Sequence, residues 1–295
     1  MKLVDEDFIM ELLKDLNISK TYAGGSVANT LSTISKLGGK CAFVGSRKND
    51  KYGKLFSKSM EQEKIDLLNK ENEEGKASSL CLVLVTPNGE RTMCTYLGAS
   101  TSLNNENLEL SSLTKSNIIY LEGYLFDLPE AKDIFYEVVD KAKEYNYQVA
   151  LSLSDPFCVE RHRKDFIKLI NKKLNILFAN DNEIETLYEC DKNEALEKAG
   201  ENINVAIATL GEEGSLMYNN NEFIKSEAFK VNAMDTTGAG DNYAAGFLYM
   251  YGMDAPLIEC MNAGSLCASE TIKSLGARPI SNLKDLLIEN NIIKN

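Results

Sequence analysis

The segment IIYLEGYLFDLPEAKDIFYEVVDKAKEYNYQVALSL, which runs from Ile118 to Leu153, decides the fold of this chain. It begins with an apolar run of strand length (Ile118–Leu121), continues with an amphipathic stretch of helical length (Leu128–Tyr145), and ends with a second apolar run (Val149–Leu153). The same alternation of strand-like and helix-like stretches continues through Val159–Ile170, Ile176–Phe178, Glu183–Cys190, Glu194–Glu201 and Val205–Thr209. Buried strands joined by helices form βαβ units around a parallel sheet. We therefore expect an α/β fold that binds its ligand beyond the carboxyl ends of the strands.

An antiparallel element is expected within this α/β pattern. Pro87-Asn88-Gly89-Glu90 separates two strand-like runs, Leu80–Thr86 and Thr92–Leu97, and Asn-Gly is a strong signal for a two-residue hairpin turn. Such a hairpin would form a sheet edge or part of a lid. No linker rich in Pro, Ser or Gly divides the chain and no internal repeat occurs. Residues 1–295 are therefore expected to form one domain with a small β lid.

The charge balance limits the partners of the chain. Lys and Arg total 32 against 44 Asp and Glu, which gives a formal net charge of -12. An acidic surface of this size repels nucleic-acid phosphates, so no nucleic-acid partner is expected. The N-terminus shows no basic region followed by an apolar stretch, and no window approaches the roughly 18 apolar residues of a membrane span. A cytoplasmic chain without membrane contact is expected.

Cysteine and histidine usage argues against several kinds of site. The seven cysteines are odd in number and form no C-x-x-C pair, which disfavours both a metal cluster and a disulfide framework. The only histidine, His162, lies between Arg161 and Arg163 and is expected on a solvated helix surface. A Ser-His-Asp or Cys-His enzyme would have to use this residue, so neither is favoured.

The most informative chemical motif is Asp235-Thr236-Thr237-Gly238-Ala239-Gly240-Asp241, which precedes a helix-like stretch. Backbone N–H groups at a helix start form an anion site that the helix dipole reinforces. A carboxylate at Asp241 could take the proton of an attacking hydroxyl while those N–H groups stabilise charge on a transferring phosphoryl group. The plainer alternative is a helix cap after a glycine turn. The full motif favours the phosphate site, although it is not a P-loop.

This motif resembles the second signature of the ribokinase-like carbohydrate kinases, the PfkB family. Other family-like segments follow in the expected order: Gly24-Gly25-Ser26-Val27-Ala28-Asn29-Thr30, Gly45 with Asp50 and Gly53, Asn180-Asp181-Asn182-Glu183, and Thr209-Leu210-Gly211-Glu212-Glu213-Gly214. The resemblance is nearest to the adenosine-kinase-like and bacterial sugar-kinase branch, on Glu90-Arg91-Thr92-Met93, Thr95-Tyr96-Leu97-Gly98-Ala99, Tyr120-Leu121-Glu122-Gly123-Tyr124 and Leu153-Ser154-Asp155-Pro156-Phe157-Cys158. It spans nearly the whole chain.

The resemblance implies a fold and a set of residue roles. The fold would be a three-layer α/β/α sandwich with a mostly parallel central sheet and a small β lid. Leu3-Val4-Asp5 resembles only an interior piece of the family's first strand, so the usual N-terminal strand is expected to be lacking. Asp241 would be the base, and the backbone of Gly238, Ala239 and Gly240 the anion hole. The remaining roles would fall to Gly24, Gly25, Asn29 and Glu122 for the substrate, Glu183 with Asn180 for Mg²⁺ and phosphates through water, Thr209, Gly211 and Gly214 along ATP, and Asn262 and Gly276 beside the adenine.

Structural alternatives exist for several of these residues. Gly24 and Gly25 could form only a turn before a helix, and Glu122 could simply end a strand. Asn180 could cap a helix with Glu183 completing a capping box, which is compatible with the functional role. The remaining pair, Gly211 and Gly214, fits a plain hairpin almost as well as a nucleotide site.

Three functions remain to be compared. The first is an ATP- and Mg²⁺-dependent transfer to a hydroxymethyl group of a nucleoside or sugar, with adenosine as the first substrate and fructose or another sugar next. The second is a truncated family member that binds nucleotide or nucleoside with little activity. A dinucleotide-binding dehydrogenase is least favoured, because the fingerprint glycines after an early strand are absent. A dependence on a monovalent cation, and the choice between a monomer and a homodimer, stay open at this point.

Overall fold

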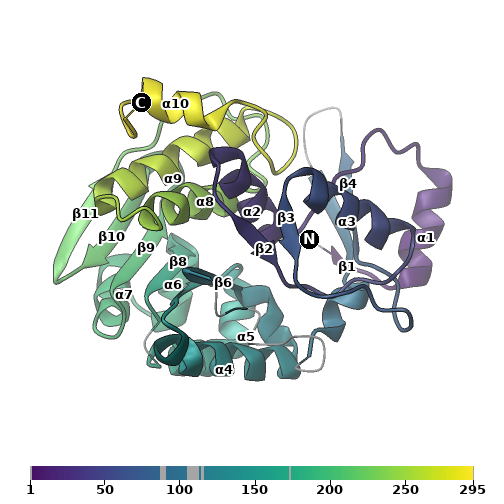
Figure 1. Cartoon of the computed structure of the whole chain (residues 1–295), viewed down its shortest axis with the longest axis horizontal. Coiled ribbons are helices and arrows are strands. Elements are labelled where there is room, and N and C mark those ends of the chain that lie inside the picture. Colours follow the sequence, from purple (N-terminus) through teal and green to yellow (C-terminus); the bar gives the residue numbers. More distant parts are fainter. Residues whose placement is uncertain (1, 87–90, 105–112, 114–115, 173, 295) are drawn as a thin grey trace.

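A six-stranded sheet forms the centre of the larger part of the molecule (Figure 1). The computed structural model describes residues 2–86, 91–104, 113, 116–172 and 174–294. The strand order is β11-β10-β9-β8-β7-β6; β6 to β9 run parallel, and β10 and β11 are antiparallel additions. The strands are β6 (Ile118–Glu122), β7 (Gln148–Ser152), β8 (Ile176–Asn180), β9 (Val205–Thr209), β10 (Ser215–Asn219) and β11 (Glu222–Ser226).

Two layers of helices cover the faces of this sheet, as Figure 1 shows. One layer packs on the alternate side chains Val149, Leu151 and Leu177, and comprises α4 (Pro129–Tyr145), α5 (Pro156–Ile170), α6 (Asp181–Tyr188) and α7 (Lys192–Gly200). The other packs on Ala150, Ile176 and Phe178, and comprises α2 (Ser26–Leu37), α8 (Ala239–Tyr251), α9 (Leu257–Ile272) and α10 (Leu283–Glu289). Both faces of a parallel sheet are buried in this arrangement, which is why its strands are apolar throughout. The expected three-layer α/β/α architecture is confirmed.

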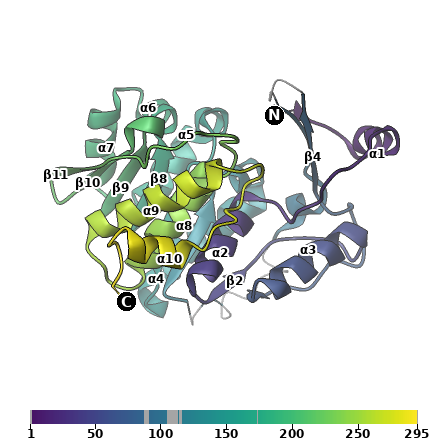
Figure 2. The ribbon, with the colours of Figure 1, turned by 90° about the horizontal axis from the view of Figure 1, so that it is seen from above.

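A small three-stranded sheet lies beside the larger part of the molecule. Its order is β1-β5-β4, with β4 (Leu80–Val85) antiparallel and β1 (Lys2–Leu3) parallel to β5 (Arg91–Tyr96). The expected pairing of the two strand-like runs is confirmed, while the predicted turn at 87–90 lies outside the described residues. Helix α1 (Glu6–Asp15) packs on this sheet on the side away from the larger part (Figure 2), where the Tyr96 hydroxyl donates to Glu6 at 2.6 Å.

A third unit connects these two sheets. The parallel strands β2 (Cys41–Phe43) and β3 (Ile65–Leu67) pair with each other, and α3 (Lys51–Gln62) packs on them through Met60. Short 3₁₀ turns complete the described elements: η1 (Gly98–Ser102), η3 (Gly123–Asp127) and η4 (Gly211–Glu213).

The first strand of the described chain belongs to the small sheet. We expected the central sheet to lack the family's N-terminal strand, and β1 indeed pairs with β5 instead. Within the described ranges, no strand that precedes β6 pairs with the six-stranded sheet. Strand β6 is therefore an edge of that sheet. No helix of the described part is both long and apolar enough to cross a bilayer.

Candidate active site

Asp241 lies in the first turn of α8, directly after the glycine turn formed by Gly238, Ala239 and Gly240. Gly238 occupies the N-cap position with φ of 78°, a left-handed conformation that glycine adopts without strain. A side chain there would also meet the carbonyl oxygen of Ala277 at 2.6 Å. At Gly240, by contrast, an added Cβ would meet nothing within 4 Å. The turn therefore packs tightly at its first glycine and leaves its second glycine open to a ligand.

Helix α2 holds the Asp241 carboxylate in place. The Ser26 hydroxyl donates to Oδ1 at 2.8 Å, and the Asn29 amide donates to Oδ2 at 2.9 Å. Burial raises the pKa of Asp241 above its ordinary value, and the hydrogen bonds from Asn29 and Ser26 oppose that rise. One lone pair of each oxygen is occupied by these donors. The carboxylate can still accept a proton through the remaining ones.

The same two helices are joined just below the carboxylate. The Thr30 hydroxyl donates to the backbone oxygen of Asp241 at 3.0 Å, and Thr33 donates to Asn242. The Asn242 amide in turn donates to the carbonyl oxygen of Gly238 at 2.7 Å. These side chains fix the first turn of α8 relative to α2, so the Asp241 carboxylate and the glycine turn are positioned together.

Glu122 is the last residue of β6, lies near Asp241 and has a shifted pKa. Burial, and after it the nearby charge of Asp241, raise the pKa of Glu122 to about 7. One carboxyl oxygen is hydrogen-bonded by Ser154, while Oε2 is buried and has no hydrogen-bond partner among the described side chains. Ser154 has φ of 72°, which costs free energy for a residue with a side chain. Glu122 therefore does more than end a strand, because its second oxygen is left for another partner.

Asn180 and Glu183 form a complete capping box at the start of α6. Glu183 accepts from the Asn180 backbone N–H at 2.9 Å and from its amide at 2.8 Å, and Asn180 accepts from the Glu183 N–H at 2.8 Å. Burial raises the pKa of Glu183 to about 7. One donor occupies each carboxyl oxygen of Glu183, and a remaining lone pair on each leaves room for a water molecule of a Mg²⁺ shell. The capping interpretation is confirmed, and the expected role toward Mg²⁺ and phosphates stays a prediction.

The predicted nucleotide residues divide into two groups. Thr209 ends β9 in register with Asn180 at the end of β8, and an added Cβ at Gly211 or Gly276 would meet nothing within 4 Å. Gly214 instead has a structural role, because a Cβ there would lie 2.0 Å from the Ser226 carbonyl oxygen. The last predicted residue, Asn262, accepts a hydrogen bond from the Ser226 hydroxyl at 2.8 Å.

The predicted substrate residues on α2 are placed differently from one another. Gly24 and Gly25 precede α2, and a Cβ added at either residue would meet no atom within 4 Å. Gly25 is the N-cap residue of the helix, with φ of 104°. Asn29 was expected to face substrate hydroxyls. Its buried amide is hydrogen-bonded at both ends, to Asp241 and to Arg278. The structure therefore places Asn29 beside the Asp241 carboxylate, and its contact with substrate hydroxyls stays a prediction.

Several residues of the site were not predicted. Ser26, Thr30 and Thr33 form a polar stripe with Asn29 at helical spacing on a buried face of α2, and this pattern was available in the sequence. Arg278 and Glu63 reach the site from distant segments, with Arg278 Nη1 donating to Glu63 at 2.7 and 2.9 Å. No local signal marks either residue.

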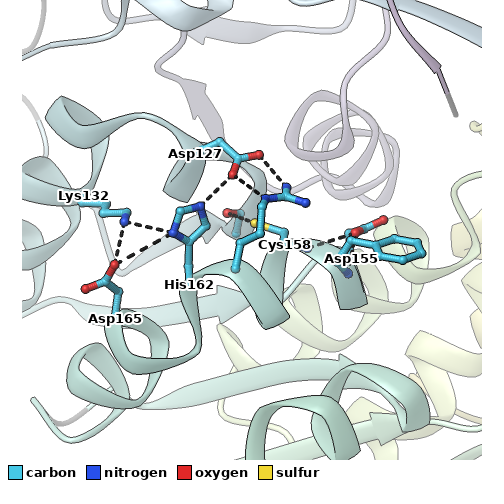
Figure 3. A network of polar contacts seen from close by, with 9 residues as sticks. Asp127, Lys132, Asp155, Cys158, His162 and Asp165 are labelled. Carbon is cyan, nitrogen blue, oxygen red and sulfur yellow. Dashed lines mark hydrogen bonds and ion pairs between the residues drawn. The ribbon is translucent and has the colours of Figure 1, made fainter.

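His162 was expected on a solvated helix surface; it does lie on a helix, α5, but its side chain is only 19% exposed and is held by its neighbours. Its Nε2 lies 2.7 Å from Asp127 and its Nδ1 lies 3.0 Å from the Lys132 ammonium, as Figure 3 shows. Lys132 also pairs with Asp165 at 2.6 Å, and Arg161 pairs with Asp127 at 2.8 Å. The ring joins η3 and α4 to α5 within a network of ion pairs.

The same network includes a set of potential metal ligands that does not suit a metal. Ligand atoms of Asp127, Cys158 and His162 lie within 4.8 Å of one another. Burial raises the pKa of the Cys158 thiol to about 12, so the thiolate that a metal needs is disfavoured. The Lys132 ammonium already contacts His162, and the Arg161 guanidinium already pairs with the Asp127 carboxylate. This cluster therefore has a structural role.

The comparisons with known proteins agree with this geometry. The sequence matches the pfkB family of carbohydrate kinases over residues 9–284. A probable fructokinase-3 of Arabidopsis thaliana is 26% identical over 274 residues, which cover 87% of this chain and 79% of the relative.

Two solved structures are similar along nearly the entire length. A probable sugar kinase protein from Rhizobium etli CFN 42 has a TM-score of 0.92 and 32% identity, covering 99% of this chain and 90% of that one. An adenosine kinase from Sinorhizobium meliloti has a TM-score of 0.91 and 35% identity, covering 98% and 90%. The chain thus belongs to the pfkB family of carbohydrate kinases and has the ribokinase-like fold. It is a carbohydrate or nucleoside kinase, and its family implies the use of ATP.

Proposed function

We propose that this kinase transfers the γ-phosphoryl group of ATP to a hydroxymethyl group of a nucleoside or sugar, with adenosine as the first substrate and Asp241 as the base. One observation carries the proposal. Asp241 lies in the first turn of α8 beside the open Gly240, and two donors from α2 hold its carboxylate. A base and an anion-binding helix start are thereby supplied by the same turn.

The reaction follows from this placement. The acceptor hydroxyl oxygen forms a bond to the γ-phosphorus while its proton passes to Asp241, and the bond from that phosphorus to the bridging oxygen breaks to release ADP. Mg²⁺ supplies charge neutralisation on the phosphates. The helix start stabilises charge on the transferring oxygens, and Ser26 and Asn29 keep the carboxylate oriented toward the hydroxyl.

Glu122 supports an assignment to acceptor binding. Its free Oε2 lies at the carboxyl end of β6, and the charges of Glu122 and Asp241 act on each other. A carboxyl group with a pKa of about 7 can donate or accept near neutral pH, so it suits an acceptor hydroxyl. A substrate lacking that hydroxyl would leave a buried polar group unpaired, which gives strong discrimination.

The small sheet supports adenosine over a hexose. Cys81, Val83 and Val85 alternate along β4 and are exposed, on the face opposite to Tyr96 and α1. Figure 2 shows α1 on the side away from the larger part of the molecule, so this apolar face is turned toward that part. We propose that the sheet acts as a lid whose apolar face covers a purine. The 35% identity with a solved adenosine kinase points the same way.

The test is an ATP-consumption assay of the purified chain with adenosine, other nucleosides, fructose, ribose or no acceptor. Production of ADP that depends on adenosine and on Mg²⁺ supports the proposal. A preference for fructose would favour the alternative that the probable fructokinase relative suggests. Binding of ATP without turnover on any acceptor would reject catalysis in favour of a binding protein. Full activity in chelator would reject the Mg²⁺ role.

A cytoplasmic location is part of the proposal. The reaction consumes ATP, and all seven cysteines are free thiols, four of them in the two large cores or beside them. Such thiols suit a reducing compartment.

A further inference from the structure

Arg278 connects the base to a part of the chain far from it in sequence. Its Nε donates to Asn29 Oδ1 at 3.2 Å, and its Nη1 donates to both oxygens of Glu63, the residue after α3. Asn29 in turn donates to Asp241. A continuous series of hydrogen bonds therefore runs from Glu63 through Arg278 and Asn29 to the base.

The buried ion pair of Arg278 is weak evidence for a role in stability. Its side chain is only 14% exposed, and Nη2 is buried with no hydrogen-bond partner within the described ranges. A buried ion pair gains little over apolar packing once desolvation is counted, and an incompletely bonded guanidinium gains less. The contact of Arg278 with Asn29 therefore becomes the relevant one.

The contact with Asn29 decides which way that amide faces. A carboxamide has a donor end and an acceptor end of nearly the same shape. Arg278 carries only donors, so it fixes Asn29 Oδ1 toward itself and Nδ2 toward Asp241. The reversed amide would place an oxygen against the carboxylate. The hydrogen bond from a cation also polarises the amide, which strengthens the second bond in the series.

We propose that Arg278 is a positioning residue that, through Asn29, keeps Asp241 ionised and oriented to take the proton of the acceptor hydroxyl. The inference rests on the proposed function of Asp241. Glu63 anchors the guanidinium, and the loop that carries Arg278 also touches the glycine turn, because the Asn242 amide bonds Ala277 O at 2.9 Å.

The other ionisable groups around this series limit how it titrates. The ionisable neighbours of Asp241 are Glu122, Tyr120 and Tyr124. Those of Arg278 are Glu63 and Lys36. On the loop that carries Arg278, the backbone N–H of Gly276 donates to Asp235. Burial raises the pKa of both tyrosines, so they stay neutral. Glu122 has a pKa of about 7, and burial also raises the pKa of Asp241, so the titrations of these two carboxyl groups have to be separated.

The test compares Arg278→Gln with Arg163→Gln, which removes an arginine from a remote ion pair with Glu189. Both changes are also made with Glu122→Gln, so that Asp241 titrates without its neighbour. In Arg278→Gln we expect kcat with the best acceptor to fall about tenfold on the acidic limb of the pH profile and to recover at higher pH. The acidic limb of the profile should move up by about one unit, because a donor to the ionised form is weakened. KM for ATP should change by less than about twofold, because the proposal places Arg278 away from ATP.

A second readout needs no turnover. Infrared spectra of ¹³C-aspartate protein, with Asp241→Asn to identify the band, report the ionisation of Asp241 directly. The proposal is supported if the pKa of Asp241 is higher in Arg278→Gln and unchanged in Arg163→Gln. It is overturned if the pKa of Asp241 is unchanged in Arg278→Gln. If Arg278→Gln does not fold, the same spectra are taken on Arg278→Lys, where a smaller rise in the pKa of Asp241 supports the proposal and no rise overturns it. A wild-type chain that turns over no acceptor would refute the proposed function, while the infrared titration would still test Arg278.

Discussion

Asn29 on α2 and Asp241 on α8 are 212 positions apart in the chain, and their side chains are joined by a hydrogen bond of 2.9 Å. This contact brings together two segments that the sequence presents separately. It also means that the protonation of the Asp241 carboxyl group depends on a helix that begins well before the glycine turn.

Replacing Asp241 by Asn should abolish proton transfer while leaving the helix start intact. We expect kcat to fall by about 10²- to 10⁴-fold, the usual contribution of a general base, with ATP affinity largely retained. Steady-state kinetics and calorimetric ATP titration check this. The control is Asp285→Asn, the same change in the first turn of α10. Near-normal turnover of the Asp241 variant would remove this residue from the base role.

Replacing Ser26 by Ala should make Asp241 harder to ionise. The Ser26 hydrogen bond lowers the pKa of Asp241, so its loss should move the acidic limb of kcat/KM to higher pH. The matched control is Ser32→Ala on the same helix, where the buried hydroxyl has no partner within the described ranges. That variant should keep a wild-type profile. Identical profiles for the two variants would contradict the role of Ser26.

The two glycines of the turn should respond differently to alanine. Gly238→Ala places a Cβ against Ala277 at a positive φ, so we expect a loss of about 1–3 kcal/mol in the free energy of unfolding. Gly240→Ala meets no atom and should leave that free energy unchanged or raise it by about 0.5–1 kcal/mol. Its kcat/KM for ATP should nevertheless fall about tenfold or more, because the new methyl group obstructs the phosphates. Denaturant titration and kinetics separate the two; full activity of Gly240→Ala would exclude close phosphate approach there.

Glu122 should make stability depend on pH. In the folded chain it keeps its proton up to about pH 7, whereas the ordinary value is 4.5. The folded state then binds more protons between these values, so the free energy of unfolding falls as pH rises through this window. Glu122→Gln should make that fall smaller by about 1–3 kcal/mol. Part of the fall should remain, because the pKa of Glu183 is also raised to about 7. Urea titrations at both ends of the window measure the slope, with the exposed Glu130→Gln as control; an unchanged slope would refute the raised pKa.

The apolar face of the small sheet should select the acceptor. Val83→Asp places a charge on that face, so kcat/KM for adenosine should fall about tenfold while that for fructose changes little. Val83→Thr keeps the shape without the charge and should have a smaller effect. Equal losses for both acceptors would show that this face does not contact a purine.

The sequence predicted the elements whose burial is regular. The runs at Ile118–Leu121 and Val149–Leu153 became β6 and β7, and the stretch between them became α4, because both faces of a parallel sheet demand apolar strands. Helix α3 was missed. Its apolar residues Tyr52, Leu55, Phe56 and Met60 recur at helical spacing, so the signal for this helix was present in the sequence.

The candidate site was predictable only where its residues form a local motif. The glycine turn and Asp241 are consecutive, and a helix start imposes their geometry. Asn29 was identified, but its contacts with Asp241 and Arg278 were not, because both partners come from distant segments. The Arg278–Glu63 pair spans 215 positions and meets Asn29 only through the tertiary fold. Such contacts are set by the tertiary fold.

The placement of His162 gives the protein a built-in spectroscopic reporter. It is the only histidine in 295 residues, so its two ring carbon protons should give one resolved pair of proton NMR resonances without isotope labelling. Because Asp127 and Lys132 hold the ring from η3 and α4, any motion that separates these elements from α5 would change those two signals. Rearrangement of this layer during a catalytic cycle could then be followed in unmodified protein, in real time and at a single site.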